Sequence, residues 1–353
     1  MARKKILFIG GSHNQTTQMH QIAECLPEYD CWFTPYYCDG FHEVLRQMKL
    51  AEPTPAGFKH VARCMNYLNA HGLQIDYQGK KNDYDLVVTS SDLLIQKNIQ
   101  HKKIVLVQEG MTDPENFFYH LVKLFPFLPR WIASTSTTGL SDAYDYFCVA
   151  SEGYRDLFIR KGVKPEKIRV TGIPNFDNCK KFYQNNFPYK NFVLVCTSDS
   201  RETLKYENRR KFIENAVRIA NGRQLIFKLH PNENHERATR EIQKYAPGAL
   251  VYTSGSAEEM IANCDVLITR FSSTVYVGLA LGKEVYSEFD INELRRLMPI
   301  QNGGTSAQNI ANVCRELLED SRPYKKVQPK RWVNAEYVPQ LMMSLFTFSK
   351  GIS

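Results

Sequence analysis

The sequence has no run of apolar residues close to the ~20 that an α-helix needs to cross a bilayer. Its first residues, MARKKILFIGGS, pass from a basic start into one short apolar run and show no signal-peptide cleavage pattern. Internal repeats and low-complexity tracts are absent too, which excludes repeat architectures. These absences lead us to expect a globular, cytoplasmic protein.

The nine cysteines form no Cys-x-x-Cys pair, and several stand inside apolar runs such as NFVLVCTSDS. This distribution favours buried thiols over a disulfide or zinc framework. The formal net charge of +8 indicates an anionic partner or, more simply, a lysine-rich soluble surface. Because the basic residues are spread out and no RNA- or DNA-binding motif is present, we expect no nucleic-acid partner.

What the chain does have is a regular alternation of short β-type runs with segments of helical period. This alternation is typical of α/β folds with parallel sheets, and 353 residues favour two domains. We expect a first series of strands and then a second one, each forming a Rossmann-like sheet. The expected strands are 4–10, 31–37, 84–90, 102–110, 144–151 and 167–173, then 191–198, 223–230, 249–254, 265–270 and 283–288. The expected helices are 15–26, 41–50, 205–221, 235–246, 256–264, 274–282 and 306–320.

A segment rich in Pro, Asn, Lys and Tyr, near residues 174–190, separates the two series. We therefore place an acceptor-side domain at residues 1–178 and a nucleotide-donor domain at residues 179–330. The amphipathic residues 331–353 are predicted to form a helix that packs back on the first domain.

Ligands of open α/β sheets bind beyond the carboxyl ends of the strands, so the residues that follow each strand are candidates for a site. After the first strand, Gly10 and Gly11 permit close backbone approach, and Ser12, Asn14 and Gln15 lie at the start of a helix. Such a turn can hold an anion or an acceptor hydroxyl. A simple strand-to-helix turn would have the same sequence.

Glu109 follows the apolar strand 104–107, where partial desolvation would raise its pKa towards that of a general base. The alternative is a glutamate that caps a helix or forms an interdomain ion pair. After strand 191–198, Ser198 and Arg201 lie where Arg201 can clamp a phosphate, or can pair with Asp199 or Glu202.

The run FKLHPNEN ends a buried strand on Lys228, His230 and Pro231. Proline keeps the residue before it out of the α region, so His230 stays at the tip of the strand, where it can donate to a phosphate oxygen. A structural histidine is the alternative. The cluster Ser272, Ser273 and Thr274 follows another strand, at the start of a helix, and places three hydroxyls where an anion binds well.

With these residues the chain resembles the GT-B superfamily of glycosyltransferases, in which two Rossmann-like domains face each other across a cleft. The motifs that carry the resemblance are VTGIPNFDN (170–178), KLHPNE (228–233) and ITRFSSTVYVGLALGKEV (268–285). The likeness is strongest to cytidine-nucleotide-dependent envelope enzymes, namely Kdo- and sialyltransferases and CDP-glycerol glycerophosphotransferases. It is more distant to UDP-N-acetylglucosamine 2-epimerases.

The resemblance implies that His230 and residues 272–274 bind the donor phosphates and that Glu109 is the base. Sialyltransferase-like enzymes carry two acids before the glycine in that position, and this chain carries one. The CDP-glycerol enzymes have Asp-Tyr-Ser-Ser where this chain has Arg270-Phe271-Ser272-Ser273, so Arg270 would face a donor carboxylate or a phosphate. The histidine and glutamate expected of an epimerase after the serine turn are missing, because Thr274, Val275 and Tyr276 stand there.

Residues 116–133 concentrate aromatic side chains with Lys123 and Arg130, in a segment too short to span a bilayer. The composition fits an interfacial segment that reaches a lipid-linked acceptor at the inner face of the cytoplasmic membrane, and it also fits a core helix followed by a loop.

The sequence thus predicts a metal- and cofactor-independent glycosyltransferase. Its expected donor is a nucleotide-sugar, CMP-linked and of the Kdo type, and its acceptor a cell-envelope glycan, of lipopolysaccharide or capsule, or a lipid-linked acceptor. The alternatives are a CDP-glycerol-type polyol-phosphate transferase, a UDP-sugar transferase or 2-epimerase, and a non-catalytic module that binds a nucleotide-sugar.

Overall fold

The structure is a computed structural model that describes residues 3–49, 52, 54–125, 128–202 and 206–320. These residues divide into two compact units. The first contains the described residues of 3–149, 155–175 and 306–320, and the second contains those of 150–154 and 176–305. The predicted helix at 331–353 lies outside the described residues.

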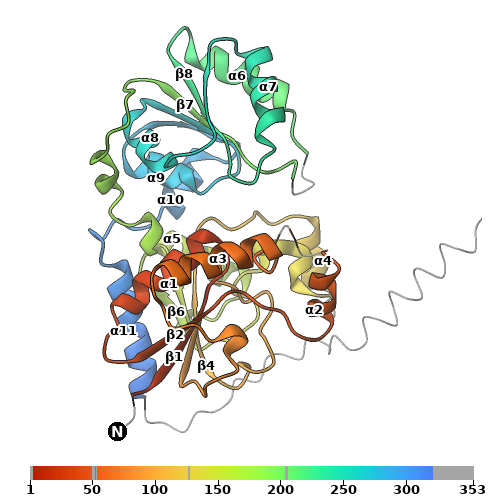
Figure 1. The fold of residues 1–353 in the computed structure, drawn as a ribbon, viewed down its shortest axis with the longest axis vertical. Coiled ribbons are helices and arrows are strands. Elements are labelled where there is room, and N and C mark those ends of the chain that lie inside the picture. Colours follow the sequence, from red (N-terminus) through yellow and green to blue (C-terminus); the bar gives the residue numbers. More distant parts are fainter. Residues whose placement is uncertain (1–2, 50–51, 53, 126–127, 203–205, 321–353) are drawn as a thin grey trace, which may run out of the picture. The chain divides into compact units, whose positions relative to one another are not determined.

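The first unit is built on a six-stranded parallel sheet of order β2-β1-β3-β4-β5-β6 (Figure 1). Its central strands are buried along almost their whole length, as continuous Val, Ile and Leu runs predict for a sheet covered on both faces. The strands are β1 (Lys5–Ile9), β2 (Asp30–Thr34), β3 (Leu86–Thr89), β4 (Lys103–Val107), β5 (Tyr146–Val149) and β6 (Ile168–Val170).

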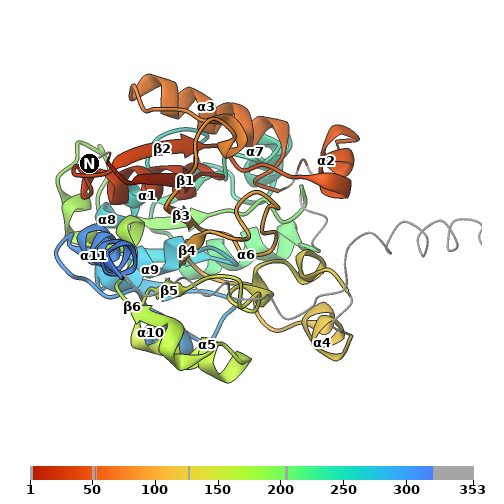
Figure 2. The ribbon, with the colours of Figure 1, turned by 90° about the horizontal axis from the view of Figure 1, so that it is seen from below.

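Helices cover this sheet, and α1, α3 and α11 share one core cluster with β1, β3 and β4. Figure 2, seen from below, shows the first unit's strands with α1 and α11 beside them. The helices are α1 (His13–Glu24), α2 (Gly40–Gln47), α3 (Phe58–Ala70), α4 (Phe117–Leu124), α5 (Glu152–Lys161) and α11 (Ser306–Glu319). Short 3₁₀ segments lie at Tyr77–Gly79, Arg130–Thr137, Pro165–Lys167, Pro174–Phe176 and Cys179–Tyr183.

The second unit is built on a five-stranded parallel sheet of order β11-β10-β7-β8-β9, with its own core cluster around β7, β8, α6 and α7. Its strands are β7 (Val193–Cys196), β8 (Leu225–Lys228), β9 (Leu250–Tyr252), β10 (Val266–Thr269) and β11 (Glu284–Tyr286). Its helices are α6 (Arg209–Ala220), α7 (His235–Tyr245), α8 (Ala257–Asn263), α9 (Thr274–Ala280) and α10 (Ile291–Leu297). The predicted class, α/β with two parallel-sheet domains, is confirmed.

The strand register aligns the ends of the central strands of this sheet. Thr269 at the end of β10 pairs with Cys196 at the end of β7, and Cys196 pairs with Lys228 at the end of β8. The loops that follow β10, β7 and β8 therefore leave the sheet at one edge, in that spatial order. The chain reverses its strand order between β7 and β10, which is where doubly wound sheets bind ligands.

The observed division differs from the predicted boundaries at α11. The predicted second domain, residues 179–330, contains residues 306–320, whereas α11 packs against α1 and β4 of the first unit. Lys4 Nζ donates to the carbonyl of Leu318 at 2.6 Å, and Lys103 Nζ donates to that of Leu317 at 2.7 Å. An apolar stripe on α11 explains this placement, because Ile310, Cys314 and their neighbours complete the core of the first sheet.

All nine cysteines are free thiols, and seven of them are buried. This agrees with the interpretation drawn from their scattered positions. None of the helices in the described part of the chain is long and apolar enough to cross a membrane.

Candidate functional site

Glu109 lies two residues beyond β4, at the edge of the first sheet, and hydrogen bonds hold both of its carboxylate oxygens. Ser12 Oγ donates to Glu109 Oε1 and Gln15 Nε2 donates to Glu109 Oε2, each at 2.6 Å. Burial raises the pKa of Glu109, and the two hydrogen bonds oppose that rise. Because neither partner carries a charge, the carboxylate is oriented without an ion pair that would reduce its basicity.

The start of α1 holds both partners in place. Ser12 is the N-cap, its Oγ accepts from Gln15 N at 3.2 Å, and Gln15 Oε1 accepts from Ser12 N at 3.1 Å. This reciprocal capping box fixes the two side chains that donate to Glu109. A side chain at Gly11 would place its Cβ 1.9 Å from Gln15 Oε1, and one at Gly10 would meet Cys64 Sγ at 2.9 Å.

The structure therefore brings Ser12 and Gln15 to Glu109, whereas Gly10 packs near Cys64 and Gly11 near Gln15. Asn14 has a different contact, since its carbonyl accepts from Asn175 Nδ2 at 2.7 Å. Glu109 is neither a helix cap nor, among the described residues, a member of an ion pair.

Sequence reasoning missed a second pair of polar side chains beside this carboxylate. Gln18, one turn after Gln15 and fully buried, donates from Nε2 to the carbonyl of Gln108 at 3.1 Å. Gln108 in turn donates from Nε2 to the carbonyl of Gly110 at 2.8 Å. The backbone on both sides of Glu109 is thus fixed by buried amides. The signal in the sequence was the glutamine at position 18, a polar residue on the apolar face of α1.

Arg130, which the sequence analysis assigns to an interfacial segment, faces inward. Its Nη1 lies 3.1 Å from Asp92 Oδ2, and Asp92 is fully buried and also accepts from the backbone of Gly139 and Ser141 at 3.0 Å each. The reason is the need to neutralise a buried carboxylate at the end of β3.

His230 stands at the edge of the second sheet, beyond β8. Asn232 N donates to His230 Nδ1 at 3.2 Å, which leaves Nε2 as the ring nitrogen that carries a proton, and Asp199 Oδ2 lies 3.7 Å from Nδ1. The imidazole is 36% exposed, which leaves Nε2–H available to a ligand. Pro231 keeps the backbone of His230 out of the α region. The backbone N–H of His230 donates to Thr197 Oγ1 at 3.0 Å and to Glu233 Oε2 at 3.2 Å.

The side chain of Lys228, the last residue of β8, is buried and already hydrogen-bonded, although the sequence predicts it as a phosphate ligand. Its Nζ donates to the carbonyl of Leu229 at 2.9 Å, and the residue is buried. Burial lowers the pKa of Lys228. Ser198, the residue that follows β7 by two positions, is also buried, and its hydroxyl lies 2.8 Å from that of Ser200.

The hydroxyls at the start of α9 form a half-buried turn beyond β10. Ser272 Oγ lies 2.9 Å from Thr274 Oγ1 and accepts from Thr274 N at 3.4 Å. Ser273 is the N-cap by position, but its side chain makes no capping hydrogen bond. Because β10 and β8 flank β7, the Ser272 turn and His230 leave the same edge on either side of Ser198.

The two arginines predicted to bind phosphate are engaged by carboxylates. Arg201 forms a bidentate pair with Glu241, with donor–acceptor distances of 2.9 and 2.8 Å. Arg270 forms one with Glu288. Arg201 therefore pairs with neither Asp199 nor Glu202 in the hydrogen bonds seen here; Glu202 binds Arg237 instead. These glutamates lie on α7 and two residues beyond β11, and which arginine each of them meets depends on how the elements are arranged around the sheet.

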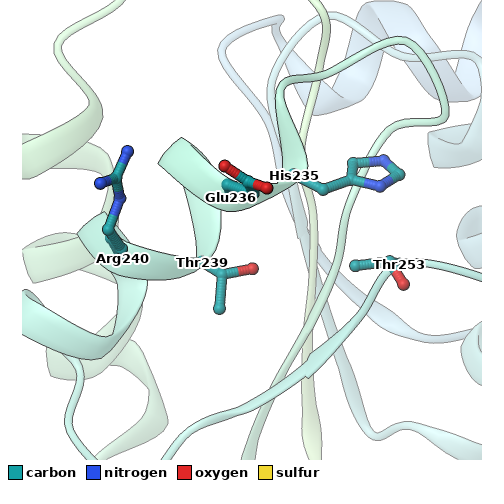
Figure 3. Close-up of a pocket in the computed structure, with 5 residues that line it drawn as sticks. All are labelled: His235, Glu236, Thr239, Arg240 and Thr253. Carbon is teal, nitrogen blue, oxygen red and sulfur yellow. The ribbon is translucent and has the colours of Figure 1, made fainter.

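A shallow pocket of about 490 Å³ opens on the second unit between the start of α7 and the end of β9. Figure 3 shows His235 and Thr253 at one side of it, Glu236 and Thr239 in the middle and Arg240 at the other side. His235 Nε2 lies 3.2 Å from the carbonyl of His230, so the pocket adjoins the backbone of the His-Pro motif.

The spacing Asp83-Tyr84-Asp85 matches an Asp-x-Asp metal motif by pattern, but it lies at the amino end of β3, opposite to the edge that carries Glu109. Asp83 pairs with Lys102, and Asp85 accepts from Lys5 N at 2.8 Å. Among the described residues, no three His, Cys, Asp or Glu side chains gather as metal ligands would.

No protein-family model matches the sequence, and no curated protein matches it. Solved structures do match its fold. A UDP-GlcNAc 2-epimerase from Neisseria meningitidis, bound to UDP-GlcNAc, is 13% identical, with a TM-score of 0.52 over 96% of this chain and 100% of that one. One from Methanocaldococcus jannaschii, in complex with UDP-GlcNAc and UDP, is 14% identical, with a TM-score of 0.50 over 97% and 99%. The wall teichoic acid polymerase TagF, soaked with CDPG, is 9% identical, with a TM-score of 0.52 over 91% and 90%.

The chain has the GT-B fold. The match extends over nearly the whole length of these structures, and both sheets of the chain contribute to it.

Proposed function

We propose that this protein is a transferase that moves a group from a nucleotide-activated donor onto an acceptor hydroxyl. The observation that carries the proposal is the Glu109 carboxylate, which two uncharged donors orient and which burial makes more basic. A second edge, with His230 Nε2–H and the hydroxyls of Ser272 and Thr274, offers hydrogen-bond donors to the phosphates of the donor.

In the proposed reaction Glu109 accepts the proton of the acceptor hydroxyl as its oxygen attacks the anomeric carbon of the sugar. The bond from that carbon to the phosphate oxygen breaks, and the electron pair leaves with the nucleotide. His230 and the Ser272 turn stabilise the negative charge that develops on the leaving phosphate.

We infer a cytidine-linked donor with a sugar of the Kdo type. Support comes from the resemblance of KLHPNE to the His-Pro motif of such enzymes. A likeness in fold to TagF is compatible with a second candidate, transfer of a polyol phosphate from CDP-glycerol. In that reaction the same groups would act while a phosphoanhydride bond breaks instead of a glycosidic one. The epimerase-like neighbours keep UDP-sugars among the donors to be tested.

For the acceptor we propose a cell-envelope glycan or a lipid-linked molecule, with peripheral membrane contact through residues 116–133. The support is the exposure of aromatic side chains around α4: Phe117 is 71% exposed, Phe118 48% and Trp131 40%. Such an apolar surface, with Lys123 exposed beside it, suits the interfacial layer of a bilayer.

Product analysis by mass spectrometry tests the proposal. The full chain would be incubated with CMP-Kdo, CMP-sialic acid, CDP-glycerol and UDP-GlcNAc, each with envelope lipids as acceptors. We expect CMP release together with a sugar-bearing acceptor, abolished in Glu109→Gln. A glycerophosphate-bearing acceptor would instead assign the second candidate. Nucleotide binding without any product would support a binding module and contradict the transferase.

A further inference from the structure

Three guanidinium groups converge on one carboxylate at the carboxyl edge of the second sheet. Arg201 comes from the loop after β7, Arg209 from the first turn of α6 and Arg270 from the end of β10. Glu207 lies among them with a fully buried side chain. Its oxygens are 2.9 Å from Arg209 Nε, 3.8 Å from Arg270 Nη1 and 3.9 Å from Arg201 Nε.

Glu207 fits this site poorly. Its Oε2 accepts one hydrogen bond, from Arg209 Nη2 at 3.3 Å. The approaches to Arg270 and Arg201 are longer than a hydrogen bond, and the 2.9 Å contact of Oε1 with Arg209 Nε does not have hydrogen-bond geometry. Within the described part of the chain, Glu207 Oε1 accepts no hydrogen bond, and Arg201 Nε, Arg209 Nε, Arg209 Nη1 and Arg270 Nη1 donate none. Native proteins seldom leave buried charged donors unsatisfied, so these groups lack an acceptor that can reach all of them.

Other glutamates hold the guanidinium groups in place from outside. Glu241 binds Arg201 in a bidentate pair, Glu288 binds Arg270 in the same way, and the buried Glu233 binds Arg209. Three cations and three carboxylates balance one another, which leaves Glu207 as one additional negative charge. The arrangement therefore accommodates one anionic group between the arginines.

The place of this cluster in the fold favours a ligand over a purely structural role. It lies between the ends of β7 and β10, where the strand order of the second sheet reverses. Thr269, at the end of β10, adds a buried hydroxyl that has no hydrogen-bond partner in the described part of the chain. Arginine forks match the oxygens of carboxylates and phosphates.

We propose that Arg201, Arg209 and Arg270 form a binding site for a carboxylate or phosphate group, and that the Glu207 carboxylate occupies it in the ligand-free protein. The incoming anion displaces Glu207 and supplies oxygens to the unsatisfied N–H groups. Glu207 thus lowers the apparent affinity of the site, since only the fraction of molecules with Glu207 displaced can bind. Binding of an anion at this site does not depend on the proposed transfer reaction.

Isothermal titration with inorganic phosphate and with acetate tests this on the full chain. We expect Glu207→Gln, which keeps the shape but removes the charge, to bind phosphate about tenfold more tightly than the wild type. Glu214→Gln is the matched control, because Glu214 lies on α6, the helix that follows Glu207, is 49% exposed and pairs only with Arg210 in the salt bridges of the described residues. It should bind phosphate as the wild type does. Equal affinities in all three proteins would overturn the proposal.

Two further measurements separate the outcomes. Adding Arg270→Gln to Glu207→Gln should cancel the gain in affinity, and a gain that persists would show that phosphate binds elsewhere. CMP and UDP, titrated in parallel, identify the source of the anion. A gain for the nucleotides as well points to a donor phosphate, whereas a gain for phosphate and acetate alone points to a free anion or a carboxylate-bearing ligand.

If Glu207→Gln does not fold, Glu207→Ala provides the test by chemical rescue. Removing the side chain leaves space for acetate, so millimolar acetate should raise the yield of folded Glu207→Ala and its melting temperature but leave Glu214→Ala unchanged. Absence of rescue, or equal rescue of both variants, would contradict the proposal.

Discussion

The two sheets end in edges of different electrostatic character. The first presents a single carboxylate, Glu109, whose hydrogen-bond partners Ser12 and Gln15 are uncharged. The second presents arginines, but each of Arg201, Arg209 and Arg270 is opposed by at least one glutamate. A lone carboxylate is left basic by its surroundings, whereas the cations are held in fixed positions with little net charge.

The comparison teaches that an excess of basic residues in a sequence does not locate an anion site. The formal charge of +8 indicates no particular site, because the arginines at the second edge are each paired with a carboxylate. What singles out groups there is local geometry: the unsatisfied N–H groups among Arg201, Arg209 and Arg270, and the imidazole of His230, whose Nδ1 accepts from a backbone N–H. Removing one group at a time from either edge tests whether the first edge supplies the base and the second binds the donor phosphates.

Removing the carboxylate from the first edge should have the largest effect. Glu109→Gln is expected to lower kcat by about 10²- to 10⁴-fold, because general-base catalysis contributes about that much. KM for the nucleotide donor should change little, since the donor phosphates are assigned to the other edge. Glu115→Gln, an exposed glutamate of the same unit, is the control. A kcat within twofold of the wild type would remove Glu109 from the mechanism.

Removing the imidazole from the second edge should have the next largest effect. His230→Ala is expected to lose about 2 to 4 kcal/mol of transition-state stabilisation, the usual loss when one preorganised donor is removed. Steady-state kinetics with a saturating acceptor would measure it, with the exposed His101→Ala as the control. Unchanged turnover would exclude His230 as a phosphate ligand.

The pH dependence of activity should show whether the hydrogen bond from Ser12 changes the pKa of Glu109. Burial raises the pKa of Glu109, so activity in the wild type should rise with pH through a pKa above the ordinary value of 4.5. The Ser12 hydrogen bond favours the charged form, and Ser12→Ala should therefore move that midpoint to higher pH. The same variant should lose about 1 kcal/mol of stability through its helix cap. A midpoint that stays in place would show that Ser12 does not act on Glu109.

The raised pKa of Glu109 also determines how the stability of the folded protein changes with pH. A carboxyl whose pKa is higher in the folded protein than in the unfolded chain binds its proton more tightly when folded. Its contribution to stability is complete below the unfolded pKa and is lost as the pH rises through the folded pKa. Glu109→Gln should remove this part of the pH dependence in denaturant titrations, and a slope identical to that of the wild type would contradict it.

The smallest effect is expected at the serine turn. Ser272→Ala removes one hydroxyl of a pair and leaves Thr274 and the backbone of α9 in place. One net hydrogen bond is worth about 1 kcal/mol, so kcat/KM for the donor should fall about fivefold. Ser254→Ala, an exposed serine after β9, provides the comparison. An equal response in both variants would place no ligand at Ser272.

Much of the fold could be predicted from the local pattern of apolar and polar residues. All eleven expected strands exist, because continuous apolar runs followed by small or polar residues are strong signals of buried parallel strands. Helices α3, α5 and α10 were not predicted. At α3 the N-cap is Gly57, which has no side chain to provide a capping signal, although Val61, Cys64 and Leu68 recur at helical spacing. The assignment of α11 to the wrong unit had another cause, because chain order does not tell which sheet a returning helix completes.

The candidate site was predictable only where one residue acts near its own strand end. Glu109, Ser12, Gln15 and His230 follow directly from inspecting those ends. The carboxylates that engage Arg201 and Arg270 come from α7 and from beyond β11. Their partners depend on sheet order, which the sequence does not state, and the inward turn of Lys228 depends on a contact with its neighbour's carbonyl.

Thermal unfolding in the presence of nucleotides tests the central claim, that the second edge binds a nucleotide phosphate through His230. The wild type and His230→Ala would be compared with CMP, CDP, UDP, UMP and GDP. A ligand that binds only the folded state adds about 2.7 kcal/mol at 100 times its Kd. We predict stabilisation of the wild type by a cytidine nucleotide, lost in His230→Ala. Equal stabilisation of both proteins, or no response to any nucleotide, would contradict the account.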